Sequence, residues 1–319
     1  MNTFRYTLFS VLAPVLFSAC YHGVHDDLNM PVPENMEAEM DVRFDWSEVE
    51  GTKPSSMSLY LFNSANSMIP VSFPNASGGA VRIMADRYQA LAYNSDTETF
   101  QSAGDSWTNF ELQVSETSLE AYTRMFATTR SVPRAEDTDE EPVIHEPDQL
   151  WTGATGQHDF RALGDDMVLT MHEATCEFHL TIHNVENSKY VTGIAATVSG
   201  MSSSFIPSKG KPSQTASIIC IPLTQTDETT LQGSVRCLGH CPEQLQSHKL
   251  VVYAMMETGQ RYYYTIDISD LMHPGGKSGG NVDVDIDIDK LPLPQPILDD
   301  GGLHPEVDEW SEITVPVEM

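Results

Sequence analysis

The chain has 319 residues and a formal net charge of −29 at pH 7, with 46 acidic and 17 basic side chains. Because such a surface repels phosphate groups, the composition argues against nucleic-acid partners and against electrostatic docking on anionic lipid headgroups. A hydrophobic fraction of 40% excludes a chain that is disordered throughout, and the length suits two domains of roughly 100–150 residues each.

Residues 1–20 have the layout of a bacterial lipoprotein signal peptide. Arg5 precedes an apolar run from Leu8 to Phe17, and the small residues Ser18 and Ala19 stand immediately before Cys20. This run is too short to span ~30 Å of hydrocarbon as a helix. We therefore predict a signal peptide over 1–19 and a lipid on the Cys20 thiol, through which the protein is attached to the membrane. The alternative is an ordinary cleaved signal followed by an incidental cysteine.

Residues 20–34 are polar and contain Pro31 and Pro33, which is typical of a flexible tether and not of a folded element. Asp26 and Asp27 follow the expected lipidation site by a few residues. An acidic cluster at this distance resembles the cell-surface export signal of Bacteroidales lipoproteins. The alternative is a tether that happens to be acidic.

Residues 35–127 are predicted to form a first β-sandwich domain. Val42, Phe44 and Trp46 alternate with charged residues, the period-two pattern of a half-buried strand. Further strands are expected at Leu59–Phe62, Val81–Ile83, Tyr88–Tyr93 and Phe110–Val114, and one short helix at Ser118–Phe126. Trp107 lies in a loop before the last strand and is a candidate contact for a glycan or a protein, with core packing as the alternative use.

Residues 128–149 differ in composition from what precedes them. Acidic residues run from Glu136 to Glu141 between Pro133 and Pro142. Because like charges and prolines leave almost nothing to bury, this segment is predicted to be an acidic linker or a long exposed loop.

Residues 150–319 are predicted to form a second β-sandwich domain. From Val168 to Ile182 the even positions are mostly apolar, and Thr258 and Gly259 separate two strongly β-prone runs as in a hairpin. The other strands expected are Val191–Val198, Ser217–Leu223, Leu250–Met256 and Tyr262–Ile268. Short strands without crossover helices favour all-β sandwiches. Tyr263, opposite in face to its two tyrosine neighbours, is a second candidate glycan or protein contact, again with cross-strand packing as the alternative.

Four cysteines follow Cys20. Cys176 and Cys220 sit in apolar strand-like runs, where a free thiol behaves as a small hydrophobic group. Cys237 and Cys241 stand close together with His240 between them and His248 shortly after, so they are candidates for a disulfide, with unpaired thiols as the alternative. A zinc site needs a second ligand pair, which is not evident in the sequence, so no metal site is predicted.

The stretch from Asn281 to Asp289 is the most regular strand pattern in the chain. Its aspartates, Asp283 to Asp289, share one face and are spaced ~6.6–7 Å apart, too far to chelate one ion together. A solvated face that opposes edge-to-edge pairing is the favoured interpretation, and a cation completed by loops is the alternative.

Patterns of known catalytic sites are incomplete. His172 and Glu173 lack the second histidine of a zinc protease, Gly275–Ser278 lacks the first glycine of a phosphate loop, and Gly200–Ser204 is not a nucleophile elbow. We therefore predict a protein that is not an enzyme and that carries no cofactor.

The second half resembles a known family. The resemblance is carried by Gly193–Met201, by the paired strands Leu250–Glu257 and Tyr262–Leu271, and by the tail Gly301–Trp310 with its final alternating run Ile313–Val317. These segments are similar to Bacteroidales lipoproteins related to the fimbrillin-like and fimbrial-anchor proteins.

The resemblance implies two tandem transthyretin-like, Greek-key sandwich domains on a lipid anchor, in the outer membrane or at the cell surface, with fimbrial subunits as partners. Fimbrillin-like subunits are opened by an arginine-directed cut, but no arginine lies between Cys20 and the first expected strand. An anchor or accessory subunit therefore fits better than a polymerising one. The alternatives are a glycan-binding surface lipoprotein and an envelope hydrolase.

Overall fold

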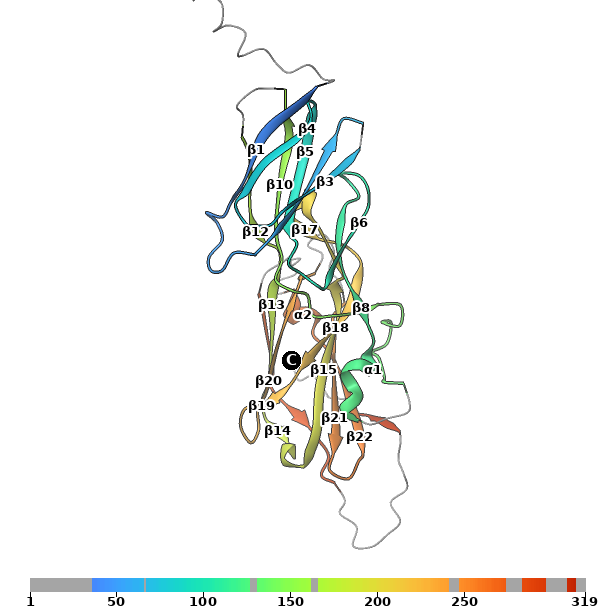
Figure 1. Cartoon of the computed structure of the whole chain (residues 1–319). Coiled ribbons are helices and arrows are strands. Elements are labelled where there is room, and N and C mark those ends of the chain that lie inside the picture. The colour runs from blue at the N-terminus through green and yellow to red at the C-terminus, as the bar shows by residue number, and fades with distance from the viewer. Residues whose placement is uncertain are drawn as a thin grey trace, which may run out of the picture.

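The computed structural model describes residues 36–65, 67–126, 131–161, 166–240, 247–273, 283–296 and 309–313. These residues are mostly strand, and they form an elongated molecule of two β-bodies stacked end to end (Figure 1). The helices are single turns: α1 (Leu119–Tyr122), α2 (Ser269–Met272), and the 3₁₀ segments η2 (Thr123–Phe126), η3 (Ser188–Tyr190) and η4 (Pro207–Lys209). The expected all-β class is confirmed. None of the helices in the described ranges has the length and apolar character needed to span a bilayer.

The upper body consists of a three-stranded sheet, ordered β11-β1-β4, and a five-stranded sheet, ordered β12-β10-β5-β2-β3. The strands are β1 (Glu37–Asp45), β2 (Met57–Asn63), β3 (Met68–Phe73), β4 (Gly78–Met84), β5 (Arg87–Asn94), β10 (Trp151–Asp159), β11 (Met167–Thr170) and β12 (His172–Glu173). Along β1 buried and exposed residues alternate, as the sequence pattern predicts. The rings of Phe44 and Phe73 meet edge to face at 5.3 Å, and those of Trp46 and Trp151 at 6.1 Å, in the core of this body.

The lower body packs a four-stranded sheet, ordered β19-β20-β13-β23, against a seven-stranded sheet, ordered β25-β22-β21-β15-β18-β9-β8. The strands are β8 (Glu116–Thr117), β9 (Val143–Ile144), β13 (Cys176–Ile182), β15 (Val191–Ser202), β18 (Ala216–Pro222), β19 (Thr224–Gln225), β20 (Leu231–Cys237), β21 (Lys249–Met256), β22 (Arg261–Asp267), β23 (Val284–Ile288) and β25 (Trp310–Glu312), with a small pair β14 (Val185–Glu186) and β24 (Leu291–Pro292) beside them. The hairpin expected at Thr258 and Gly259 joins β21 to β22.

A third sheet and a shared apolar core join the two bodies. The sheet is ordered β17-β16-β7-β6, from β6 (Phe100–Ala103), β7 (Glu111–Val114), β16 (Ser204–Ile206) and β17 (Lys211–Pro212). Beside it, Phe62 and Leu91 of the upper body contribute to the same core cluster as Phe110, Phe205 and Leu238. Because this cluster is built from both halves of the chain, we expect the two bodies to unfold together.

The chain returns to the upper body after residue 150. Strand β10 pairs with β5, for example Thr152 with Tyr93, and β11 pairs with β1, for example Val42 with Met167. The expected domain boundary between 149 and 150 therefore does not coincide with the pairing of the strands. The single alternating run expected from Val168 is divided among β11, β12 and β13, and Val168 itself is 37% exposed because β11 belongs to a different sheet from β13 and has the opposite phase.

Within the predicted linker, residues 132–144 pack against the lower body, so this segment is not an exposed loop throughout. Val132 and Ala135 are buried against β15, β18 and β21. The Arg134 guanidinium donates to backbone carbonyls of the same segment, the Glu141 carbonyl at 2.8 Å among them. Strand β9 then joins the seven-stranded sheet. The run of like charges predicted an exposed segment because its few apolar side chains are scattered between the acidic ones.

Candidate functional site

The N-terminal residues singled out by the sequence, Cys20, Asp26 and Asp27, lie outside the described residues, as does Cys241. Their proposed roles in lipidation, export and disulfide formation remain predictions. The first described strand, β1, begins at Glu37, at the end of the upper body remote from β14 and the β21–β22 hairpin (Figure 1).

Cys237 is buried and makes no disulfide within the described residues. Its candidate partner, Cys241, lies outside them, so that pairing stays a prediction. The cross-strand neighbour of Cys237 is Cys176, and their Sγ atoms lie 3.5 Å apart within the apolar core of the lower body. Cys220 is also buried and free. Burial raises the pKa of the Cys220 thiol to about 12. The two thiols expected to be inert, Cys176 and Cys220, are therefore placed as predicted.

Trp107 and Tyr263 are both half-buried. Trp107 packs edge to face on Phe62, with ring centroids 6.0 Å apart, in the core shared by the two bodies. Tyr263 lies against the core cluster that contains Tyr253, its cross-strand neighbour on β21. Both side chains thus contribute to packing, the alternative that the sequence left open. The large hydrophobic residues that are exposed in the described ranges are Met36, Met84, Val168 and Leu271, none of them aromatic.

The aspartates of β23 face solvent. Asp283, Asp285, Asp287 and Asp289 are exposed, whereas Ile286 and Ile288 are buried, so the alternation predicted for this strand is correct. The Asp283 carboxylate accepts a hydrogen bond from the Glu177 backbone N–H at 2.9 Å, and Asp287 lies 3.3 Å from His183 Nε2. Within the part of the chain that the structure describes, these carboxylates do not converge as a metal-binding group.

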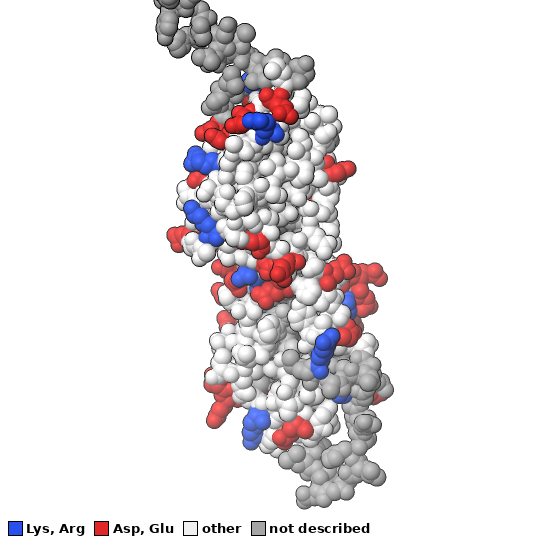
Figure 2. Space-filling view, viewed as in Figure 1, with Lys and Arg blue, Asp and Glu red and all other residues white. Residues whose placement is uncertain are grey.

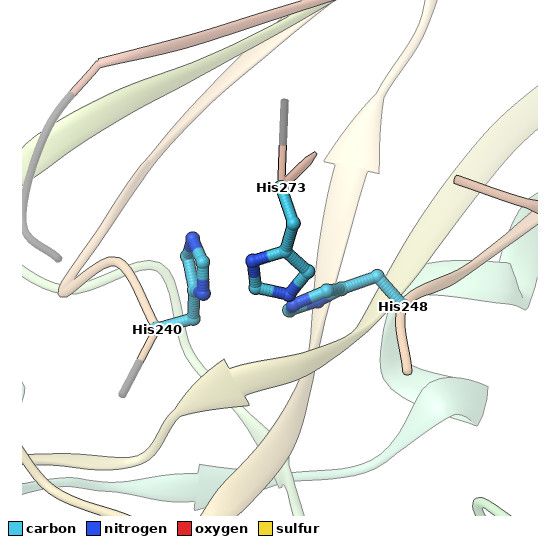
Figure 3. Close-up of side chains that lie close together, drawn as sticks. All are labelled: His240, His248 and His273. Atoms are coloured by element: carbon cyan, nitrogen blue, oxygen red, sulfur yellow. The ribbon is translucent and has the colours of Figure 1, made fainter. Parts of the chain in front are cut away.

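The structure brings together three histidines that the sequence did not group. His240, His248 and His273 lie on different segments, and one ring nitrogen of each is within 4.8 Å of the others (Figure 3). Their ring centroids are 4.7 to 5.0 Å apart. The exposed fractions are 1% for His240, 0% for His248 and 7% for His273, so the cluster is closed off from solvent.

His248 is held by β15 and α2. Its Nδ1 donates to the Ser199 carbonyl oxygen at 2.9 Å, and its backbone N–H donates to Ser269 Oγ, also at 2.9 Å. Gly200, next to Ser199, has φ +77° and touches the ring: a Cβ there would stand 2.8 Å from His248 Nδ1. A glycine is needed at this bulge of β15 because it combines left-handed backbone with close contact to the imidazole.

His240 and His273 are placed by the ends of neighbouring elements. His240 follows β20, and the carbonyl of Gly239 accepts a hydrogen bond from the Ser202 N–H of β15 at 2.9 Å. His273 ends α2, and its N–H donates to the Ser269 carbonyl at 3.0 Å. Three elements of the lower body therefore direct imidazole rings to one point near the junction with the upper body.

Burial keeps His240 and His248 uncharged. Desolvation, together with the neighbouring histidines, lowers the pKa of His240 to about 4. Desolvation also lowers the pKa of His248 to about 4, although the hydrogen bond with Ser199 opposes this change. At neutral pH both imidazoles are therefore neutral, the form that carries a lone pair on one ring nitrogen.

The sequence contained a partial signal for this cluster. His240 and His248 are close in sequence, but a zinc site is recognised in a sequence by a second pair of Cys or His ligands, and His273 stands alone. The hairpin supplies the missing link, because its register pairs Lys249 with Asp267 and so sets the residue before β21 beside the residues after β22.

The surface offers shallow depressions on the lower body. One of about 320 Å³ is lined by Val185, Ser188, Val191, Ile194, Leu231 and Leu293. Another, of about 450 Å³, is lined by residues of β13, β19 and β20, with His179 as the titratable side chain in its wall. On the face seen in Figure 2, acidic side chains gather around the middle of the molecule. Neither depression combines a histidine with a carboxylate, the pairing that a hydrolytic pocket commonly uses.

The fold resembles solved structures from Bacteroidales at low sequence identity. A candidate adhesin from Bacteroides ovatus matches with a TM-score of 0.61 and 13% identity, over 82% of this chain and 95% of that one. A candidate polysaccharide-binding protein (DUF1812) from Bacteroides thetaiotaomicron matches with a TM-score of 0.52 and 11% identity, over 78% and 90%. The fimbrial anchor protein Mfa2 from Porphyromonas gingivalis matches with a TM-score of 0.49 and 9% identity, over 79% and 91%.

A search among curated proteins found no match. The sequence itself matches one family model, described as "Domain of unknown function (DUF5119)", over residues 24–221. The chain therefore belongs to the DUF5119 family.

Proposed function

We propose that this protein is a non-catalytic, lipid-anchored component of the cell envelope that acts as an anchor or accessory subunit of fimbria-like surface structures. In this proposal the acylated Cys20 holds it at the outer membrane, and Asp26 and Asp27 direct it to the cell surface. Fimbrial subunits are its partners. The two bodies correspond to tandem transthyretin-like sandwiches.

The observation that carries the proposal is the extended pair of β-bodies, which follows the fold of a candidate adhesin over 82% of this chain and 95% of that one. This geometry supports different roles for the two ends of the molecule. A tether over residues 20–34 joins a membrane-bound Cys20 to β1, and at about 3.3–3.6 Å per residue it spans at most about 50 Å. The upper body then lies nearest the membrane, and the lower body points away from it and is available to partners.

The edges of the sheets are consistent with a docking role for the lower body. The outer edge of β23 carries exposed aspartates, and edge charges oppose pairing with another chain. The seven-stranded sheet ends at the short strand β25 (Trp310–Glu312), whose exposed side chains include Ser311 and Glu312. A recurring way in which a sheet binds an extended segment is the addition of a partner strand to such an edge. We therefore favour the edge of the seven-stranded sheet as the docking site.

The test combines localisation with capture of partners. Intact cells are labelled with a probe that does not cross the membrane, and the protein is then captured from the wild type and from Cys20→Ala, with Cys220→Ala as the control for loss of a thiol that lies in the folded body. We expect labelling and membrane attachment to be lost in Cys20→Ala alone. A β-rich filament subunit should be captured with the wild type.

Two results would reject parts of this proposal. If Cys20→Ala remains attached to the membrane as the wild type does, the proposed lipid anchor is rejected. If the protein is attached and labelled at the surface but captures a polysaccharide and no protein subunit, the fimbrial role is rejected in favour of glycan binding. The export signal is tested separately with the double variant Asp26→Asn/Asp27→Asn, which should reduce surface labelling, whereas the exposed pair Asp139→Asn/Glu140→Gln should not.

A further inference from the structure

We propose that His240, His248 and His273 form a structural binding site for a divalent transition metal, with Zn²⁺ as the ion that it takes. The site lies inside the lower body, near its junction with the upper body. It is independent of the membrane anchor and of the surface partners proposed above.

The spacing of the rings suits one ion. When three atoms lie within 4.8 Å of one another, some point is at most about 2.8 Å from each of them, and Zn–N bonds measure about 2.0–2.1 Å. Each coordinating nitrogen therefore has to move by less than about 1 Å to reach a zinc ion. Figure 3 shows the rings turned toward one another from separate segments, so small side-chain rotations close this distance.

The contacts of His248 prepare it as a ligand. The Ser199 carbonyl accepts the Nδ1 proton, which leaves the lone pair on Nε2. Metal-binding histidines commonly donate their second ring N–H to a carbonyl or carboxylate in this way, and the donation fixes the tautomer and the orientation of the ring. Among the described residues, His248 Nε2 is buried without a hydrogen-bond partner.

The second observation is the number of polar atoms left without partners. Both ring nitrogens of His240 are buried and make no hydrogen bond within the described residues. A buried polar group without a partner costs about 1–3 kcal/mol, and natural proteins contain few of them. A metal ion at the centre of the cluster bonds to one nitrogen of His240 and to His248 Nε2, which removes two of these deficits at once.

The donor set selects the class of ion. Three imidazoles suit Zn²⁺ and its neighbours in the first transition row, whereas Ca²⁺ and Mg²⁺ require oxygen ligands. Three protein ligands leave a fourth coordination position of a tetrahedral ion for a further donor. The Asp267 carboxylate stands behind the site: it accepts a hydrogen bond from Ser269 Oγ at 2.6 Å, and Ser269 Oγ in turn accepts the His248 backbone N–H. The same carboxylate forms an ion pair with the Lys249 ammonium group at the surface.

The position indicates a structural role. The ligands stand at the end of β20, at the start of β21 and at the end of α2. Leu238, two residues before His240, belongs to the core shared by the two bodies. An ion bound here therefore links the ends of three secondary-structure elements of the lower body. Because these ends lie beside the shared core, the ion stabilises the junction between the two bodies.

The test uses the full-length chain, purified in detergent and stripped with EDTA, to which ZnCl₂ is added. We expect one Zn²⁺ per chain by mass spectrometry of metals, a rise in the melting temperature, and binding at least about ten-fold weaker in His240→Ala and His273→Ala. His179→Ala, which removes an exposed histidine of β13, is the matched control and should bind zinc as the wild type does.

Cobalt supplies a readout that does not depend on the variants. Co²⁺ bound in a four-coordinate, imidazole-rich site gives intense visible absorption, whereas Co²⁺ on surface groups gives weak bands. Intense bands in the wild type that are lost on addition of ZnCl₂ support the proposal. The proposal is overturned if the wild-type chain takes up no zinc. It is also overturned if the zinc and cobalt signals of both histidine variants equal those of the wild type. If His273→Ala does not fold, His273→Gln replaces it and the cobalt spectrum of the wild type still decides.

Discussion

The Ser199 carbonyl oxygen accepts the Nδ1 proton of His248 at 2.9 Å, and the Lys249 N–H donates to Ser199 Oγ at the same distance. One serine of β15 thus fixes both the imidazole and the start of the next strand. The relationship depends on Gly200, because only a residue without a Cβ lets the backbone turn against the ring.

Replacement of Gly200 by alanine should disturb the histidine cluster. The added Cβ would stand 2.7 Å from the Ser247 carbonyl oxygen and 2.8 Å from His248 Nδ1, at a residue with φ +77°. We expect the free energy of unfolding to fall by about 1–3 kcal/mol and zinc binding to weaken, measured by urea denaturation and by zinc titration.

Gly259→Ala is the matched control for this substitution. Gly259 has φ +82° but nothing within 4 Å of an added Cβ. It should therefore lose only about 1 kcal/mol, the backbone cost of a left-handed residue, and should bind zinc normally. If Gly200→Ala and Gly259→Ala change the unfolding free energy and zinc binding equally, the contact between Gly200 and His248 contributes to neither.

Phe110→Ala should uncouple the two bodies. Phe110 is completely buried in the shared core, where its ring lies 4.7 Å from that of Tyr60 and 6.0 Å from that of Phe62. We expect a loss of about 3–5 kcal/mol and, in calorimetry, two transitions in place of one. Phe73→Ala removes a ring from the upper core alone. It should therefore destabilise the protein but leave a single calorimetric transition.

Acid should remove a stabilising contact at Asp159. Hydrogen bonds from Arg161, and a further one from Arg87 at 3.2 Å, hold the pKa of the Asp159 carboxyl well below its usual range. A carboxyl with a lowered folded-state pKa stabilises the native state above about pH 4 and loses this contribution as the pH falls through the folded value. Because the pair is at the surface, we expect Asp159→Asn to cost less than about 1 kcal/mol near neutral pH.

The difference between Asp159→Asn and the wild type should shrink below about pH 4, as measured by urea denaturation over a pH series. Asp41→Asn, at an exposed position of β1, controls for the loss of one negative charge. If the difference in unfolding free energy between Asp159→Asn and the wild type stays constant down to low pH, the stabilisation does not come from the ionised Asp159 carboxylate.

The thiols of the lower body should be protected in the native state. Cys176, Cys220 and Cys237 are 6%, 6% and 2% exposed. The hydrogen bond with Cys237 and burial raise the pKa of Cys176, and burial raises that of Cys220 to about 12, so few thiolates form. We expect iodoacetamide to label these cysteines only in denaturant, as read by peptide mass spectrometry. A cysteine introduced at the exposed Ser102 should react in the native protein.

Local pattern was sufficient for several of the elements. The alternation from Val42 to Trp46 and that along β23 predicted the buried faces correctly, because successive side chains of a strand point to opposite faces whatever sheet the strand joins. The hairpin at Thr258 and Gly259 was predictable for the same reason: turn residues between two β-prone runs act over a few positions.

What the sequence determined, then, was an acidic chain of the all-β class and the alternating faces of many of its strands, while the membrane address stays a prediction. Only the tertiary structure decided that β10 and β11 return to the upper body, that Cys176 is the neighbour of Cys237, and that His273 joins His240 and His248. Strand pairing and ring convergence depend on contacts between residues far apart in the chain, and period-two alternation is the same for every partner that a strand can take.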